Sequence, residues 1–215
     1  PFRIEENSFG LLEARPDPER DLKSTDVDVL SVCPFSDKAK SETSLSEEYF
    51  GKLTYNSAQL GAYVACHSGH VTDERIRQQG SSGAIGRWML STLLRKGMVD
   101  YVVHVRPNRI GSDADSLYTY TVDSDPDLIL ESSKSAYHPV TMAEVIQVIR
   151  ARPGRYAITG VPCFIKAIRL LAAQDGALAE RIRFTVGIIC GGMKSKNYSE
   201  AIGWEQGIAP SNLVR

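Results

Sequence analysis

Two short apolar segments that end in equivalent turns constrain the fold of this chain most strongly. The first runs Tyr156-Ala-Ile-Thr-Gly-Val-Pro-Cys163, and the second runs Phe184-Thr-Val-Gly-Ile-Ile-Cys190. Each has the apolar, β-branched content of a strand, and a helical pattern over residues 164–173 separates them. This order predicts parallel neighbouring strands in an α/β sheet, with both cysteines at its carboxyl edge.

The matching positions of Cys163 and Cys190 suggest a shared ligand. Open α/β sheets bind ligands in the crevice at the carboxyl ends of their strands. Paired thiolates suit a metal ion or an iron–sulfur cluster. A hydrolase that pairs Cys163 with His138 is an alternative, but it gives the second cysteine no role.

The remaining pattern also alternates between strand and helix. We expect strands over residues 62–66, 99–105 and 117–122, and helices over residues 72–79, 84–96 and 141–150. The fold class is therefore α/β, with a mainly parallel or mixed sheet flanked by helices over residues 58–215. Residues 1–57 are polar and rich in proline, which predicts a small irregular N-terminal appendage that wraps the main body.

The composition is that of an ordinary globular protein, with 42% hydrophobic residues and a formal net charge of -1. Near-neutral charge gives no general attraction for nucleic acid or anionic membranes. No apolar run approaches the roughly 20 residues that span a bilayer, so we expect a cytoplasmic protein. Four cysteines are too few for a disulfide-linked secreted scaffold, which favours metal binding or catalysis.

A glycine- and serine-rich turn, Gly80-Ser81-Ser82-Gly83-Ala84, directly precedes the strongest helical pattern. Its glycines would allow close approach of a ligand, and the free N–H groups of a helix start favour an anion such as a flavin pyrophosphate. Arg75 and Arg77 lie just upstream and would add positive charge. The alternatives are an ordinary helix cap and solvated surface arginines.

A second polar cluster, Ser132-Ser133-Lys134-Ser135-Ala136-Tyr137-His138-Pro139, predicts a loop that binds the polar edge of a cofactor, or else a plain solvated loop. Lys194 and Lys196 would bring positive charge close to Cys190, unless they are only surface charges. A zinc half-site of Cys66, His67 and His70 has no second half in the sequence.

Cys33 precedes Pro34 at the end of a short predicted helix. A Cys-Pro pair ends many ferredoxin-type cluster loops. A buried cysteine without a ligand role is the alternative, because the upstream cysteines of such a loop are absent from this sequence.

Five motifs in the same order resemble the coenzyme F420 hydrogenase/dehydrogenase beta-subunit family, over about residues 49–205. They are Ile76-Arg77-x-x-Gly80-Ser81-Ser82-Gly83, Leu94-x-x-Gly97-x-Val99-Asp100, Ser133-Lys134-Ser135-x-Tyr137-x-Pro139-Val140, Gly160-Val161-Pro162-Cys163 with Ala167-x-Arg169, and Gly187-Ile188-Ile189-Cys190-Gly191-Gly192.

The resemblance implies an iron–sulfur flavoprotein oxidoreductase. Such a protein passes electrons between a four-iron, four-sulfur cluster, FAD and a two-electron carrier or reducible substrate, for which a deazaflavin is one candidate. A ferredoxin-like or hydrogenase-type partner subunit is also implied. A thiol-dependent α/β enzyme, or a binding module without functional redox centres, is the competing interpretation.

The resemblance also implies site residues. FAD would be lined by Arg75, Arg77, the turn from Gly80 through Ser81, Ser82 and Gly83 to Ala84, and Ser133, Lys134, Ser135 and Tyr137, of which Lys134 and Tyr137 are the candidate proton donors. Cys33, Cys163 and Cys190 would bind cluster iron, with residues 1–57 as the remnant of a ferredoxin-like segment.

Three departures from the family pattern qualify these expectations. Cys33 lacks its upstream partner cysteines, and Cys66 lies where the family needs none, so we expect Cys66 to be a small core residue. The chain starts at Pro1 and stops at Arg215 without a helix-stop signal, which is consistent with a piece of a longer protein. Cluster and flavin would then depend partly on residues outside it.

Overall fold

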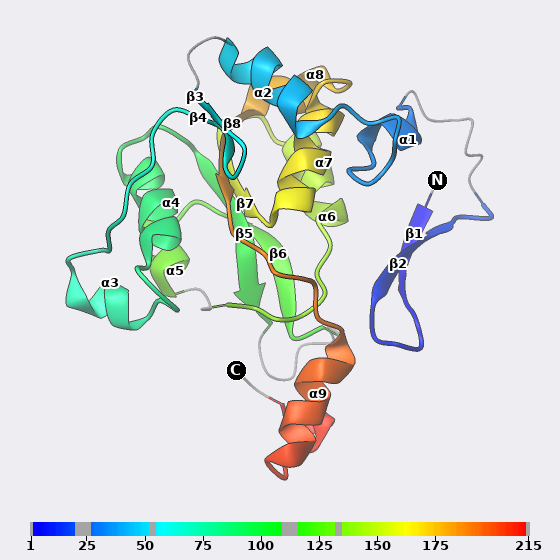
Figure 1. Cartoon of the computed structure of the whole chain (residues 1–215). Coiled ribbons are helices and arrows are strands. Elements are labelled where there is room, and N and C mark those ends of the chain that lie inside the picture. Colours follow the sequence, from blue (N-terminus) through cyan, green and yellow to red (C-terminus); the bar gives the residue numbers. More distant parts are fainter. Residues whose placement is uncertain (1, 20–26, 52–54, 109–115, 132–134, 214–215) are drawn as a thin grey trace.

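A four-stranded mixed sheet forms the centre of the protein (Figure 1). The computed structural model describes residues 2–19, 27–51, 55–108, 116–131 and 135–213. The strands lie in the order β6-β5-β7-β8, where β5 pairs with β6 antiparallel and the other two pairs are parallel. Their bounds are Tyr101–Pro107 for β5, Tyr118–Asp123 for β6, Tyr156–Gly160 for β7 and Ile182–Gly187 for β8.

Helices cover both faces of this sheet. On one face, Leu90 and Leu93 of α4 and Ile129 of α5 pack with Val102 and Ala157 of the sheet. On the other face, α6, α7 and α8 bury their apolar side chains against Val103, Tyr156 and Ile158, among others. The helices span Ile85–Arg95 (α4), Pro126–Glu131 (α5), Ala143–Ala151 (α6), Pro162–Ala172 (α7) and Gly176–Arg181 (α8).

The central strands follow from their sequences. Every residue of β7 is buried, as expected for an apolar strand with parallel neighbours on both sides and helices on both faces. Val102 and Val103 are neighbours in β5 and point into opposite cores, because successive side chains of a strand alternate between faces. The predicted α/β class and the mixed sheet are confirmed.

The part of the chain before α4 contains more regular structure than the irregular appendage predicted for residues 1–57. It forms a hairpin, two short helices, a second small hairpin and a helix before α4: β1 (Phe2–Glu6), β2 (Leu12–Pro16), α1 (Val29–Val32), α2 (Glu42–Phe50), β3 (Tyr55–Ser57), β4 (Gly61–Tyr63) and α3 (Glu74–Gln78). Lys166 of α7 pairs with Glu42 of α2 at 3.0 Å, and the Arg169 guanidinium lies 4.7 Å from the ring centroid of Tyr49. Helix α2 is therefore fixed against α7.

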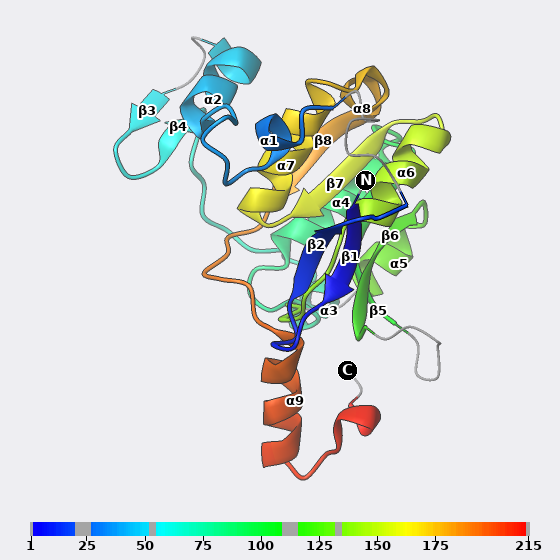
Figure 2. The same ribbon diagram turned by 90° about the vertical axis from the view of Figure 1, so that its right-hand side faces the viewer.

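The chain ends in α9 (Lys196–Glu205) and a short 3-10 turn, η3 (Pro210–Asn212). Helix α9 extends away from the sheet, and the turn of the β1–β2 hairpin lies beside its start (Figure 2). The Lys196 N–H donates to the carbonyl of Gly10 at 2.7 Å. No helix within the described residues is long and apolar enough to cross a membrane.

Candidate functional site

The two cysteine turns follow neighbouring parallel strands, as predicted. Gly160, the last residue of β7, lies in register with Gly187, the last residue of β8. The Ile188 N–H extends this pairing and donates to the Gly160 carbonyl at 2.9 Å. Cys163 and Cys190 each lie three residues beyond these glycines, at the carboxyl edge of the sheet.

The surroundings of the two thiols differ. Cys163 is half-buried in the first turn of α7, directly after Pro162, whereas Cys190 is exposed in the segment that leads to α9. Burial, with the nearby Cys163 as a second cause, raises the pKa of the Tyr120 phenol. The Tyr120 hydroxyl donates to the Thr159 carbonyl at 3.1 Å, so a buried tyrosine supports the end of β7 beside Cys163.

The described residues do not assemble a cluster site. They contain no group of three or more cysteine, histidine, aspartate or glutamate side chains placed to hold a metal ion. Cys33 caps the C-terminus of α1, as its Cys-Pro sequence predicts, with its N–H donating to the Val29 carbonyl at 3.2 Å. A cubane cluster takes four ligands, so the cysteines of this part of the chain do not by themselves fit one.

Cys66 is exposed, so the expectation of a small core residue was wrong. The predicted strand over residues 62–66 ends at Tyr63, the last residue of the short β3–β4 hairpin. The chain beyond it is irregular and solvent-exposed as far as His70.

The glycine–serine turn forms a tight structure at the start of α4. Ala84, the N-cap residue, has a φ of 59°, and it is the one non-glycine residue with positive φ in the described chain. A Cβ atom on Gly80 would lie 2.7 Å from the Ala84 Cβ, and one on Gly83 would lie 3.0 Å from the Gly69 carbonyl. Both glycines are therefore needed to fold the turn itself.

The N-cap residue of α4 makes no side-chain cap. Ala84 has no polar side-chain atom, and in an isolated helix the first N–H groups lack backbone acceptors. Ser81 and Ser82 are exposed beside it. Helix N-termini bind phosphate through such N–H groups and through the helix dipole.

The structure brings the two predicted flavin-binding segments into contact. The Ser135 hydroxyl donates to the Ser81 hydroxyl at 3.0 Å, although the two residues are 54 positions apart. Tyr137, two residues further on, is 61% exposed. Ser133 and Lys134 lie outside the described residues.

Arg87 was missed by sequence reasoning, although it lies at the centre of this arrangement. Its Nη1 donates to the Leu130 carbonyl at 2.9 Å, and its Nη2 donates to the Gln79 carbonyl. The available signal was a cation in the first turn of a helix, where the helix dipole disfavours positive charge.

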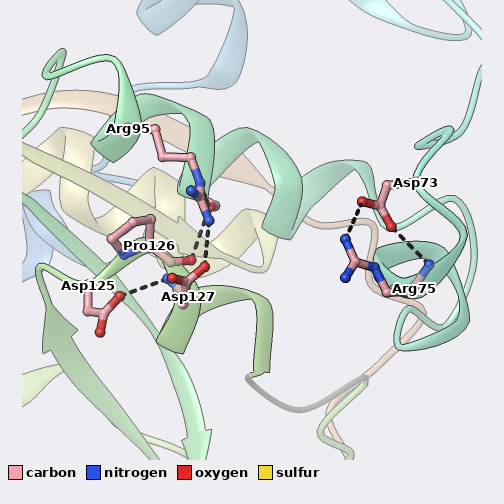
Figure 3. A network of polar contacts seen from close by, with 7 residues as sticks. Asp73, Arg75, Arg95, Asp125, Pro126 and Asp127 are labelled. Atoms are coloured by element: carbon pink, nitrogen blue, oxygen red, sulfur yellow. Dashed lines mark hydrogen bonds and ion pairs between the residues drawn. The ribbon is translucent and has the colours of Figure 1, made fainter.

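The two upstream arginines are less closely integrated. Arg75 pairs with Asp73 of its own turn at 3.4 Å, and its side chain is 91% exposed (Figure 3). Arg77 is also exposed, although its carbonyl accepts the Gly80 N–H at 3.0 Å. The structure thus connects the backbone of α3 to the turn, while both guanidinium groups face solvent.

The residues just after Ser135 contact the first turns of α9. The Ser199 hydroxyl donates to the Tyr137 carbonyl at 3.2 Å. His138 is 5% exposed, and its Nδ1 has no hydrogen-bond partner among the described residues. Burial, and secondarily the charge of Lys196, lowers the pKa of His138.

The lysines near Cys190 have protein partners. Lys196 pairs with Glu6 at 3.4 Å and with Glu200 at 3.9 Å. The Lys194 ammonium lies 5.9 Å from the Tyr198 ring centroid.

Comparisons with known proteins identify the family of this chain. Residues 66–147 match the family described as coenzyme F420 hydrogenase/dehydrogenase, beta subunit N-term, and residues 154–215 match the family that describes the C terminus of the same beta subunit. No curated protein matches the chain.

A xenon-derivatised structure of the F420-reducing NiFe hydrogenase complex from Methanosarcina barkeri contains a chain with a similar fold, with a TM-score of 0.60 at 20% identity. The similarity covers 73% of this chain and 54% of that chain, so this chain spans about half the length of its structural neighbour.

The two family matches follow one another in order and together extend over most of the described sheet and its helices. The hydrogenases and dehydrogenases named in both descriptions are oxidoreductases. The chain belongs to the coenzyme F420 hydrogenase/dehydrogenase beta-subunit family.

Proposed function

We propose that this chain is the flavin-binding part of an oxidoreductase, and that FAD lies at the carboxyl edge of the sheet, over the start of α4. The observation that carries the proposal is the hydrogen bond between Ser135 and Ser81, which joins two distant segments into one polar surface. When bound, FAD would exchange an electron pair with one partner and single electrons with another.

The residues of the turn fit a flavin pyrophosphate. The uncapped N–H groups at the start of α4 and the hydroxyls of Ser81 and Ser82 would donate to phosphate oxygens. Ser135 would complete the surface from the opposite side. Arg75 and Arg77 would contribute long-range attraction for the anion, since both side chains are exposed to solvent.

Ser133, Lys134 and Tyr137 are proposed to line the same flavin. Lys134 and Tyr137 remain the proposed proton donors, because they supply an ammonium and a phenol on this loop. The exposure of Tyr137 is compatible with that role, since an exposed side chain can contact a bound ligand.

Cys163 and Cys190 are proposed ligands of cluster iron, with Cys33 as a third. A complete four-iron, four-sulfur cluster would need further ligands, because the described residues hold no group of three. The electron acceptor is proposed to be a deazaflavin or another small redox substrate, and a hydrogenase-type or ferredoxin-like subunit is the proposed protein partner.

Titration of the anaerobically purified protein with FAD tests the proposal. We expect saturable binding with quenched flavin fluorescence, and weaker binding for both Ser81→Ala and Ser135→Ala. Ser124→Ala is the matched control, because this exposed serine precedes α5 at the other end of that helix. A protein that binds no FAD, or equal losses in all three variants, would contradict the proposed site.

A further inference from the structure

We propose that Arg87 is a positioning residue of the flavin site: it holds the two loops that form the site at their working separation. The inference rests on the proposed function. The hydrogen bond between Ser81 and Ser135 is weak by itself, because both residues are exposed and their hydroxyls can exchange partners with water. Another interaction must hold the two segments together.

The Arg87 guanidinium supplies that interaction. It reaches the Gln79 carbonyl, two residues before Ser81, and the Leu130 carbonyl, five residues before Ser135. A guanidinium is planar and rigid, so two carbonyls bound to its separate nitrogens are fixed relative to each other.

Both acceptors lie at helix C-termini. Gln79 is the C-cap residue of α3, and Leu130 belongs to the last turn of α5. The last carbonyls of a helix lack backbone donors and carry partial negative charge, which favours a cation. Arg87 therefore connects the ends of α3 and α5 to the start of α4, and these attractions offset its unfavourable place in the first turn of α4.

The packing of α4 on α5 does not depend on Arg87. Arg95, two turns further along α4, pairs with Asp127 at the start of α5 (Figure 3). The Ser91 hydroxyl donates to the Pro126 carbonyl at 3.0 Å, and Leu90 packs in the same buried cluster as Ile129. Loss of Arg87 should thus release the loops while the two helices stay packed.

Arg95→Ala is consequently a matched control for Arg87→Ala. Both changes remove an arginine of α4 that contacts α5, but only Arg87 reaches the loops of the site. Arg87→Lys keeps the positive charge but loses the rigid, forked guanidinium. Its affinity for FAD should therefore lie between those of the wild type and Arg87→Ala.

The first measurement is the dissociation constant of FAD, from quenching of flavin fluorescence. We expect about tenfold weaker binding for Arg87→Ala, with an intermediate loss for Arg87→Lys, since a tenfold change corresponds to one charge-assisted hydrogen bond. Arg95→Ala should stay within about twofold of wild type. Unchanged binding in Arg87→Ala, or equal loss in Arg95→Ala, would overturn the proposal.

The second measurement needs no flavin. Amide hydrogen exchange of the apo protein should become about tenfold faster at residues 80–84 in Arg87→Ala but not in Arg95→Ala. Failure of the wild type to bind FAD would refute the proposed function, and the exchange measurement would still decide the role of Arg87. Unchanged exchange at residues 80–84 would refute that role.

Discussion

The Nε2 atom of His104 lies 2.8 Å from an Oδ atom of Asp123, in a region where the histidine is only 3% exposed. Arg106 shares the same carboxylate, with Nη1 at 3.2 Å from both oxygens. The hydrogen bond from His104, supported by Arg106, lowers the pKa of Asp123 despite its burial. A polar network thus lies on the α4–α5 face of β5 and β6.

We expect Asp123→Asn to lower the free energy of unfolding by about 3 kcal/mol, because the buried His104 and the partly exposed Arg106 lose their charged acceptor. Urea denaturation at neutral pH measures this change. The exposed Asp37→Asn serves as the control and should stay within about 0.5 kcal/mol of wild type. A loss in Asp123→Asn no larger than the control would mean that the network adds nothing to stability.

The buried His138 predicts a pH dependence. Its pKa is lower in the folded protein than the ordinary value of 6.5, so below about pH 6.5 the unfolded chain binds a proton that the folded protein excludes. Stability should therefore decline as the pH falls from about 7 to about 5. The charged groups that act on this histidine are Lys196, Glu6 and Glu200, and the Tyr118 ring packs against it.

Denaturation of wild type and His138→Gln at several pH values tests that dependence. Glutamine does not titrate, so the variant should lose less stability over the same pH interval. His67→Gln, at an exposed position, is the control and should keep the wild-type slope. An identical slope in His138→Gln would exclude His138 as the cause.

Three glycines around the start of α4 predict opposite effects of alanine. Gly80→Ala and Gly83→Ala should destabilise by about 1–3 kcal/mol, because their Cβ atoms would press on Ala84 and on the Gly69 carbonyl. Gly86→Ala should stabilise by about 0.5–1 kcal/mol, since its Cβ would meet no described atom within 4 Å and alanine favours the helix. Thermal denaturation of the three variants would show whether each change raises or lowers stability, and a destabilised Gly86→Ala would contradict this account.

The proposed role of Cys163 and Cys190 predicts that a protein without both thiols binds no iron. Iron content after anaerobic reconstitution should fall to background in the Cys163→Ser and Cys190→Ser double variant, because serine is a poor ligand for cluster iron. Cys66→Ser removes an exposed thiol outside the proposed ligand set and should retain wild-type iron. Full iron in the double variant would exclude both cysteines as ligands.

Much of the fold could be predicted because apolar periodicity is a local signal. Local sequence alone indicates β7 and β8, which are apolar runs, and α4, which has an amphipathic pattern. The short helix α8 was missed, because six residues with one buried leucine show little periodicity. Likewise, β1 and β2 alternate apolar and polar residues over only four positions each, which is a weak signal, and both strands are exposed along their whole length.

The candidate site was predictable only in its parts. The turn at Gly80 and the loop at Ser135 could each be selected from composition, but their contact depends on how α4 and α5 pack. Arg87 and the pair of His104 with Asp123 are tertiary interactions between residues 43 and 19 positions apart, and no local pattern encodes such distances. Conversely, the equivalence of Cys163 and Cys190 followed directly from the repeated strand-and-turn order.

The contact between Glu6 and Lys196 also sets an order of events during synthesis. These residues are 190 positions apart, so a ribosome adding about 5–20 residues per second needs about 10–40 seconds to deliver the second after the first. An isolated two-stranded hairpin is marginally stable in water. The β1–β2 hairpin therefore emerges long before the helix that secures it, and the nascent chain must keep it available until α9 appears.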